Sequence, residues 1–131
     1  FFFNHLSVGN MVRGFTDVFF CTLLVGDLAD ILMKMAAKEL RGIYHVVSPH
    51  CLSKYDFGCL LARQFGLDDR LIEPVSWKEA GLKAARSPNL RLSVRKLARD
   101  LDMSLPDQEG GMRRFYQLYC EGYPRRLREM L

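Results

Sequence analysis

Short apolar runs with strand propensity are few in this sequence, and helical patterns separate them. Such runs occupy residues 11–15, 20–25 and 43–47, and a fourth apolar run at 71–75 is interrupted by a glutamate. Residues 43–47 lack polar alternation, which is typical of a strand buried on both faces. The runs are too few for a complete doubly wound α/β domain. The pattern predicts one α+β unit over residues 1–131, rich in helix, with a few short strands.

Helical periodicity and helix-end residues predict the other elements. Ser53 begins the clearest helix, because Asp56 three residues later completes an acidic form of the capping box and Gly66 ends the apolar pattern. Asp27 and Ser93 are predicted to cap two more helices. Three segments complete the prediction: the end of a helix at 1–8, a single turn at 76–81, and a last helix from 107 that a proline at 124 ends before a basic turn.

The composition is that of a globular protein with no membrane partner. Hydrophobic residues make up 49% and charged residues 26% of the chain. No apolar run approaches the roughly 18–20 residues that cross a bilayer. The opening FFFNHLSVGN lacks the basic segment and cleavage site of a signal peptide. The chain also starts without Met inside an apolar pattern, so we expect a piece of a longer, cytoplasmic protein.

The cysteines and histidines form no recognisable site. Cys21, Cys51, Cys59 and Cys120 include no C-x-x-C pair, and with three scattered histidines they match no zinc spacing. His50 and Cys51 are adjacent, an arrangement that seldom lets a base face a nucleophile. Disulfides are possible, but a chain of this size needs none, so we expect reduced thiols.

Positive charge is concentrated in the C-terminal half. Residues 1–77 carry 7 basic and 8 acidic groups, whereas residues 78–131 carry 12 basic and 7 acidic groups. A net charge of +5 in the second part indicates an anionic partner, and solvated helix faces are the alternative. Nucleic acid is the less favoured anion, because the basic residues are not interleaved with an aromatic platform.

Motifs for independent catalysis are absent from the sequence. There is no G-x-G-x-x-G, no P-loop, no Tyr-x-x-x-Lys, no G-x-S-x-G and no H-E-x-x-H. We therefore predict no catalytic residues, no cofactor-binding residues and no metal ligands in this chain.

The order of several segments resembles a known enzyme family. DLADIL is followed by GIYHVVSPHCLSKYDFGCLLARQFGLDDRLIEPVSW and then by ARSPNLRLSVRKLARDLDMSLP. Together they resemble the C-terminal part of dTDP-4-dehydrorhamnose reductases, which belong to the extended short-chain dehydrogenase/reductase superfamily. The resemblance covers residues 11–106, and its most specific parts are S-K-Y-D-F and R-x-P-N-x-x-L.

This resemblance implies a two-part oxidoreductase. In the family, an N-terminal Rossmann domain binds NADPH or NADH and carries Tyr-x-x-x-Lys, and a smaller C-terminal domain binds the sugar nucleotide. The family reduces a dTDP-4-keto-6-deoxy sugar in dTDP-L-rhamnose biosynthesis. Because the cofactor carries the hydride, we expect the chain alone to be inactive and to hold no cofactor. Its implied partners are a dTDP-sugar nucleotide and the Rossmann domain.

The resemblance also implies substrate-binding residues. Arg86 matches an arginine that contacts the nucleotide diphosphate, a role that suits the always-charged, bidentate guanidinium. Asn89 adds a polar contact or only caps the turn. Val12 and Arg13 belong to a segment that matches a strand near the nucleotide base in relatives.

One segment departs from the family pattern. In DVFFCTLLVGDLA, Phe20 occupies a glycine place and Thr22 a proline place, so the pocket is expected to differ in shape. A non-catalytic regulatory relative is therefore the alternative function. The exposed apolar surface expected around residues 1–3 could also support a homodimer.

Overall fold

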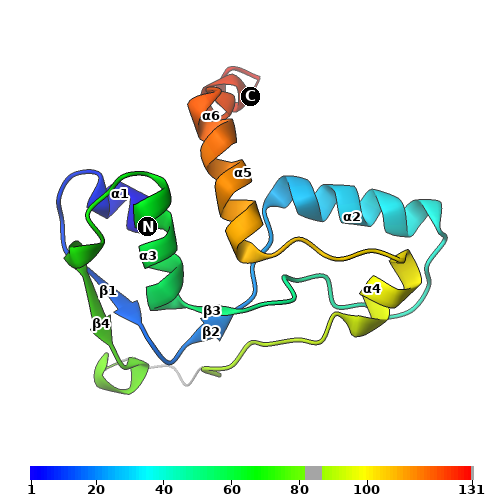
Figure 1. Ribbon diagram of the computed structural model, residues 1–131, viewed down its shortest axis with the longest axis horizontal. Coiled ribbons are helices and arrows are strands. Elements are labelled where there is room, and N and C mark those ends of the chain that lie inside the picture. Colours follow the sequence, from blue (N-terminus) through cyan, green and yellow to red (C-terminus); the bar gives the residue numbers. More distant parts are fainter. Residues whose placement is uncertain (82–86, 131) are drawn as a thin grey trace.

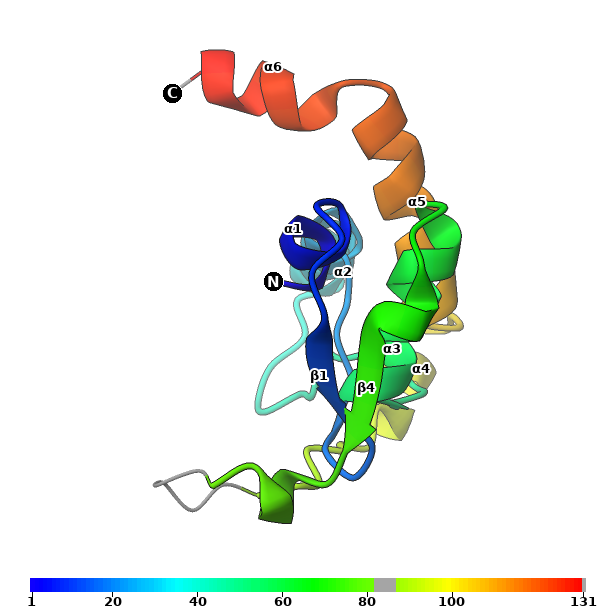
Figure 2. The same cartoon turned by 90° about the vertical axis from the view of Figure 1, so that its left-hand side faces the viewer.

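The computed structural model describes residues 1–81 and 87–130, and its first layer is a two-stranded parallel sheet covered by helices (Figure 1). Strand β1 (Val12–Phe15) pairs with β4 (Ile72–Val75), and the two lie side by side in Figure 2. Helices α1 (Phe2–Leu6) and α3 (Lys54–Gln64) pack against β1. The buried residues of this layer are Leu6, Val12, Cys59, Ala62 and Ile72.

Gly14 permits the close approach of α3 to β1. A Cβ atom at Gly14 would lie 2.8 Å from the backbone Cα of Tyr55, nearer than side chains approach in real proteins. The start of α3 is fixed as the sequence predicts, because the Ser53 hydroxyl accepts a hydrogen bond from the Asp56 amide at 3.0 Å. The first residues of α3 are therefore held directly over the strand.

A second, antiparallel pair connects the two ends of the molecule. Strand β2 (Phe19–Phe20) pairs with β3 (Leu52–Ser53), with Phe20 opposite Leu52. Phe19 also forms a parallel bridge to Asn89. Short 3-10 helices at Asp69–Leu71 and Trp77–Glu79 flank β4. Two distant parts of the chain, β3 and the turn at Asn89, therefore meet beside β2.

A second core lies between α2 (Val25–Ala37) and α4 (Arg95–Leu101), on the right-hand side of Figure 1. Its buried residues are Ile31, Val94, Leu97, Leu101 and Leu105. Residues 43–47 pack here but form no strand, contrary to the sequence prediction. Tyr44, Val46 and Val47 bury apolar surface against this core, whereas Ile43 is 84% exposed. The apolar run therefore reflects burial of side chains against helices and not pairing with a neighbouring strand.

Two predicted helix caps are wrong. Leu24, with extended backbone, precedes α2, and Asp27 lies in the first turn, where Arg114 forms an ion pair with its buried carboxylate. Val94, not Ser93, precedes α4 and caps it without a side-chain bond. Asp27 therefore contributes to tertiary packing rather than to helix initiation.

The C-terminal helices rise from the middle of the molecule. Helix α5 (Gln108–Cys120) is capped by Asp107, and α6 (Tyr123–Glu129) extends from its upper end in both views. Pro124 falls in the first turn of α6, so the predicted basic turn is helical. An aromatic cluster joins α1, the end of α3 and α5; it consists of Phe3, Phe65, Phe115, Tyr116 and Tyr119.

Candidate functional site

A cavity of about 680 Å³ opens where β1, α1 and α3 converge. Its lining includes Val12, Arg13 and Phe15 from β1 and Lys54, Phe57 and Leu61 from α3. Two of the four residues predicted from the sequence therefore line this cavity. Val12 is also a buried core residue. Arg13 lies 3.5 Å from Glu73 across the β1–β4 pair, and both side chains are more than half exposed, so this ion pair contributes little stability.

A second cavity, of about 370 Å³, adjoins the first. Phe15 and Lys54 line both cavities. The rest of the second lining comes from two separate segments and includes Val18, Trp77, Pro88 and Leu90. The two cavities consequently share one aromatic and one basic lining residue.

Of the other two predicted residues, Asn89 lies between Pro88 and Leu90, which line the smaller cavity. Arg86 lies outside the described residues. The Asn89 side-chain oxygen accepts a hydrogen bond from the Arg91 amide at 3.1 Å. Asn89 therefore caps its turn, one of the two roles that the sequence left open. The bridge from Phe19 to Asn89 places the turn next to β2.

Asp17 holds Trp77 beside the smaller cavity, a role that the sequence analysis missed. The carboxylate accepts a hydrogen bond from the Ser76 hydroxyl at 2.5 Å and another from the Trp77 amide at 2.9 Å. Both bonds favour the charged form, and the Ser76 hydroxyl is the larger cause of a lowered Asp17 pKa. Asp17 could be recognised in the sequence as a polar turn residue, but its partner Trp77 could not, because it lies about sixty residues away.

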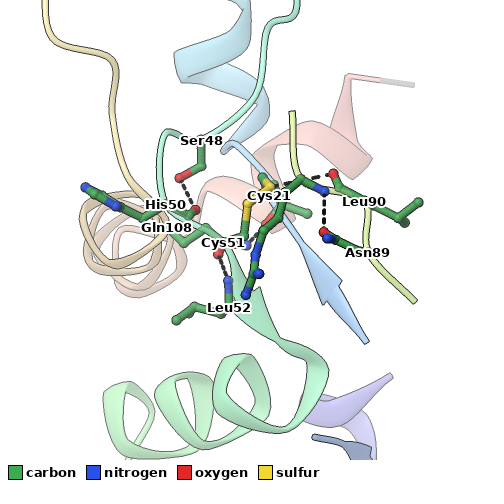
Figure 3. The surroundings of a disulfide bond; sticks show 10 residues. Cys21, Ser48, His50, Cys51, Leu52, Asn89, Leu90 and Gln108 are labelled. Carbon is green, nitrogen blue, oxygen red and sulfur yellow. Dashed lines mark hydrogen bonds between the residues drawn. A yellow bond between two sulfur atoms is a disulfide. The ribbon is translucent and has the colours of Figure 1, made fainter. Parts of the chain in front are cut away.

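A disulfide joins Cys21 to Cys51, so the prediction of four reduced thiols is wrong for this pair (Figure 3). The two cysteines adjoin the Phe20–Leu52 pair of the β2–β3 ladder, which brings their Cα atoms to 4.4 Å. Cys59 is buried and Cys120 is exposed, and both are free. Sequence spacing could not reveal this bond, because it depends on the pairing of two-residue strands.

The unusual DVFFCTLL segment contacts both the larger cavity and the residues around the disulfide. The Phe20 ring lines the larger cavity and packs at an edge-on angle against Phe57, with ring centroids 5.2 Å apart. The Thr22 hydroxyl accepts a hydrogen bond from the Gln108 amide group at 2.9 Å, and the Gln108 oxygen accepts one from the Leu52 amide at 2.8 Å. Buried Gln108 thus connects the segments on either side of the disulfide.

Within residues 1–81 and 87–130, no group of three or more His, Cys, Asp and Glu side chains could hold a metal ion. Over the same ranges, no helix has the length and apolar character needed to cross a membrane. The arrangement suits ligand binding, because two cavities with many apolar lining residues share the basic residue Lys54.

Comparisons with known proteins agree with this architecture. The model of the RmlD substrate binding domain family matches residues 3–120. The solved structure of dTDP-4-dehydrorhamnose reductase from Bacillus anthracis, in complex with NADP, is 23% identical and superposes with a TM-score of 0.80, over 88% of this chain and 41% of that one. The Clostridium acetobutylicum dTDP-4-dehydrorhamnose reductase is 18% identical, also with a TM-score of 0.80, over 90% of this chain and 42% of its own.

A more distant likeness extends to a different enzyme. The dTDP-glucose 4,6-dehydratase from Bacillus anthracis, in complex with NAD, is 14% identical with a TM-score of 0.70, over 92% of this chain and 38% of that one. Among curated protein sequences no match is found. The chain spans about two fifths of the length of the solved structures that it matches. With its helix-rich α+β fold and the family match over most of its length, the chain belongs to the RmlD substrate-binding-domain family.

Proposed function

We propose that the chain is the sugar-nucleotide-binding part of an NADPH- or NADH-dependent reductase that acts on a dTDP-4-keto-6-deoxy sugar. The observation that carries the proposal is the pair of cavities that meet at Lys54 and Phe15 in a member of this family. A preceding Rossmann domain would supply the cofactor site and the Tyr-x-x-x-Lys pair. The chain, one domain of such an enzyme, would then perform no hydride transfer by itself.

The predicted binding residues fit different parts of this site. Val12 and Arg13 line the larger cavity, while Asn89 shapes the turn beside the smaller one. Ser87 and Pro88, next to Arg86, line the smaller cavity, which supports a role for the Arg86 guanidinium at the diphosphate. Catalysis, cofactor binding and metal binding are assigned to no residue of this chain.

Exposed apolar side chains around α1 support a docking role for this face. Phe1 is 75%, Val8 69% and Met11 68% exposed, and Phe1 and Met11 line the larger cavity. We propose that the Rossmann domain covers this face and that the isolated chain uses it to form homodimers. Analytical ultracentrifugation of the isolated chain tests this point; a strict monomer at high concentration would contradict it.

Calorimetric titration of the full-length protein with dTDP-rhamnose tests the function. Arg86→Ala should weaken affinity by about 1–3 kcal/mol, the range for hydrogen bonds to charged groups. Arg95→Ala is the matched control, because it removes an exposed guanidinium from the start of α4. Failure of the unmodified full-length protein to bind dTDP-rhamnose, with its cofactor site intact, would refute the proposal.

The alternative is a non-catalytic regulatory relative of the extended reductases. The observation that favours it is Phe20, which lines the larger cavity at a glycine place of the family pattern. The two proposals differ in the residues that precede the chain. A Rossmann domain without Tyr-x-x-x-Lys, in a protein that binds but does not reduce the sugar nucleotide, would favour the alternative.

A further inference from the structure

Lys54 is the first residue of α3 and lies at the junction of the two cavities. Its amide donates a hydrogen bond to the Val18 carbonyl at 3.0 Å, and the preceding residue, Ser53, is almost fully buried. The backbone that carries Lys54 is therefore fixed at both the β2 and the α3 side. Only the long side chain is free to adjust to a ligand.

Among the described residues that line the two cavities with Lys54, none is an aspartate or a glutamate. The Lys54 ammonium lies 5.8 Å from the centre of the Phe15 ring. It forms no ion pair with any carboxylate within residues 1–81 and 87–130. Charges attract more strongly between low-dielectric walls than in open water. A positive charge in such a place is best satisfied by an anion that enters with the ligand.

We propose that Lys54 binds the diphosphate of the sugar nucleotide, with the nucleoside in the smaller cavity and the sugar in the larger one. This inference rests on the proposed function, and it assigns an additional phosphate-binding residue to the same site. A sugar nucleotide has a neutral base and a neutral sugar at its ends and two negative charges between them. The site has the complementary order, with a cavity on each side of the lysine.

The linings of the two cavities support this orientation. The smaller cavity is lined by the aromatic residues Trp77 and Phe15 and by Pro88, residue types on which a base can stack. The larger cavity adds the polar groups of Arg13 and His5, which can donate hydrogen bonds to sugar oxygens. This orientation differs from the one that the resemblance implies, in which the segment of Arg13 lies near the nucleotide base. Lys54 is the cationic residue common to both linings among the described residues.

The test compares ligands that differ in phosphate content in the full-length protein. Calorimetry on the unmodified protein, Lys54→Met, Lys54→Arg and Lys78→Met would use dTDP-rhamnose, dTDP and thymidine, the last by competition. Lys54→Met should weaken dTDP and dTDP-rhamnose by about ten- to a hundredfold and leave thymidine within about twofold. Lys54→Arg should restore most of the affinity. Lys78→Met, the control, removes an exposed charge beside Trp77 and should behave as the unmodified protein.

Each outcome separates the inference from the function on which it rests. If the unmodified protein binds dTDP-rhamnose and Lys54→Met binds it equally well, the role of Lys54 is refuted and the proposed function stands. If the unmodified protein binds neither dTDP nor dTDP-rhamnose, both are refuted. If Lys54→Met weakens thymidine as much as dTDP, the lysine shapes the cavities and does not bind phosphate. A smaller salt dependence of dTDP affinity in Lys54→Met would further support the inference.

Discussion

Removing the Cys21–Cys51 bond should cost a large share of the chain's stability. The two cysteines are separated by 30 residues. In the chain-entropy model, closing a loop of that length lowers the entropy of the unfolded chain by about 12 cal/mol/K, or roughly 3.6 kcal/mol at 25 °C. Domains of this size are stable by only about 5–15 kcal/mol. We therefore expect the double variant Cys21→Ser, Cys51→Ser to unfold at much lower urea concentration.

Urea unfolding, followed by the fluorescence of Trp77, measures this loss under non-reducing conditions. Cys120→Ser is the matched control, because it removes an exposed free thiol and should leave the unfolding midpoint unchanged. Dithiothreitol should lower the midpoint of the unmodified chain to that of the double variant and should not affect the double variant. The variant should also show a steeper dependence on urea, because its unfolded state exposes more surface.

A hydrogen bond of the free Cys21 thiol would restore part of the stability lost on reduction. Cys21 sulfur lies 3.7 Å from the Leu90 carbonyl oxygen, so a free thiol could donate a weak hydrogen bond there. Serine at the same position could do likewise, which is why dithiothreitol and the double substitution are expected to agree. A midpoint that is insensitive to dithiothreitol, together with two titratable thiols at Cys21 and Cys51, would refute the reasoning and restore the prediction of reduced cysteines.

Other substitutions test the packing and the electrostatics of the same fold. Gly14→Ala should destabilise the chain by about 1–3 kcal/mol, because the new methyl group would collide with the Tyr55 backbone; an unchanged thermal midpoint would contradict this close approach. Leu97→Ala should cost about 2–5 kcal/mol in urea unfolding, because Leu97 is 1% exposed in the α2–α4 core. Because the Ser76 hydroxyl lowers the pKa of Asp17 below its usual 3.8, the stabilising contribution is present above that pH and is lost as pH falls through the folded-state pKa. The unfolding midpoint of Asp17→Asn should therefore fall less on acidification below about pH 4 than that of the unmodified chain, and equal slopes would contradict the assigned bonds.

The sequence predicted those elements whose signals are local. The start of α3 needs only Ser53 and Asp56, which are three residues apart, and the structure contains the bond between them. The end of α3 follows from Gly66, which adopts a left-handed backbone conformation with φ of +65°. The helix-rich α+β class was predicted correctly for the same reason, since helical periodicity is a short-range pattern.

Predictions failed where a residue had two possible uses and tertiary contacts chose between them. Asp27 is of a residue type that often caps helices, yet Arg114 of α5 pairs with it in the folded chain. Residues 43–47 have the apolar content of a buried strand, yet they pack against helices. In both cases the sequence showed correctly that the carboxylate needs a polar partner and that the apolar side chains need to be buried. It did not show which residues they contact, because those residues lie far along the chain.

The candidate site shows the same difference between local sequence signals and tertiary contacts. Arg13, predicted from the resemblance, lines a cavity but already has a nearby carboxylate in Glu73. Lys54 lies inside the S-K-Y-D-F segment that most clearly indicated the family, and nothing in that segment distinguishes its charge from that of any helix-surface lysine. Its significance comes from Phe15, Trp77 and the turn at 87–90, which approach it from three other parts of the chain. The proposed binding role of Lys54 depends on these distant segments coming together, because the absence of an ion-pair partner among the described residues is a property of the fold rather than of the sequence.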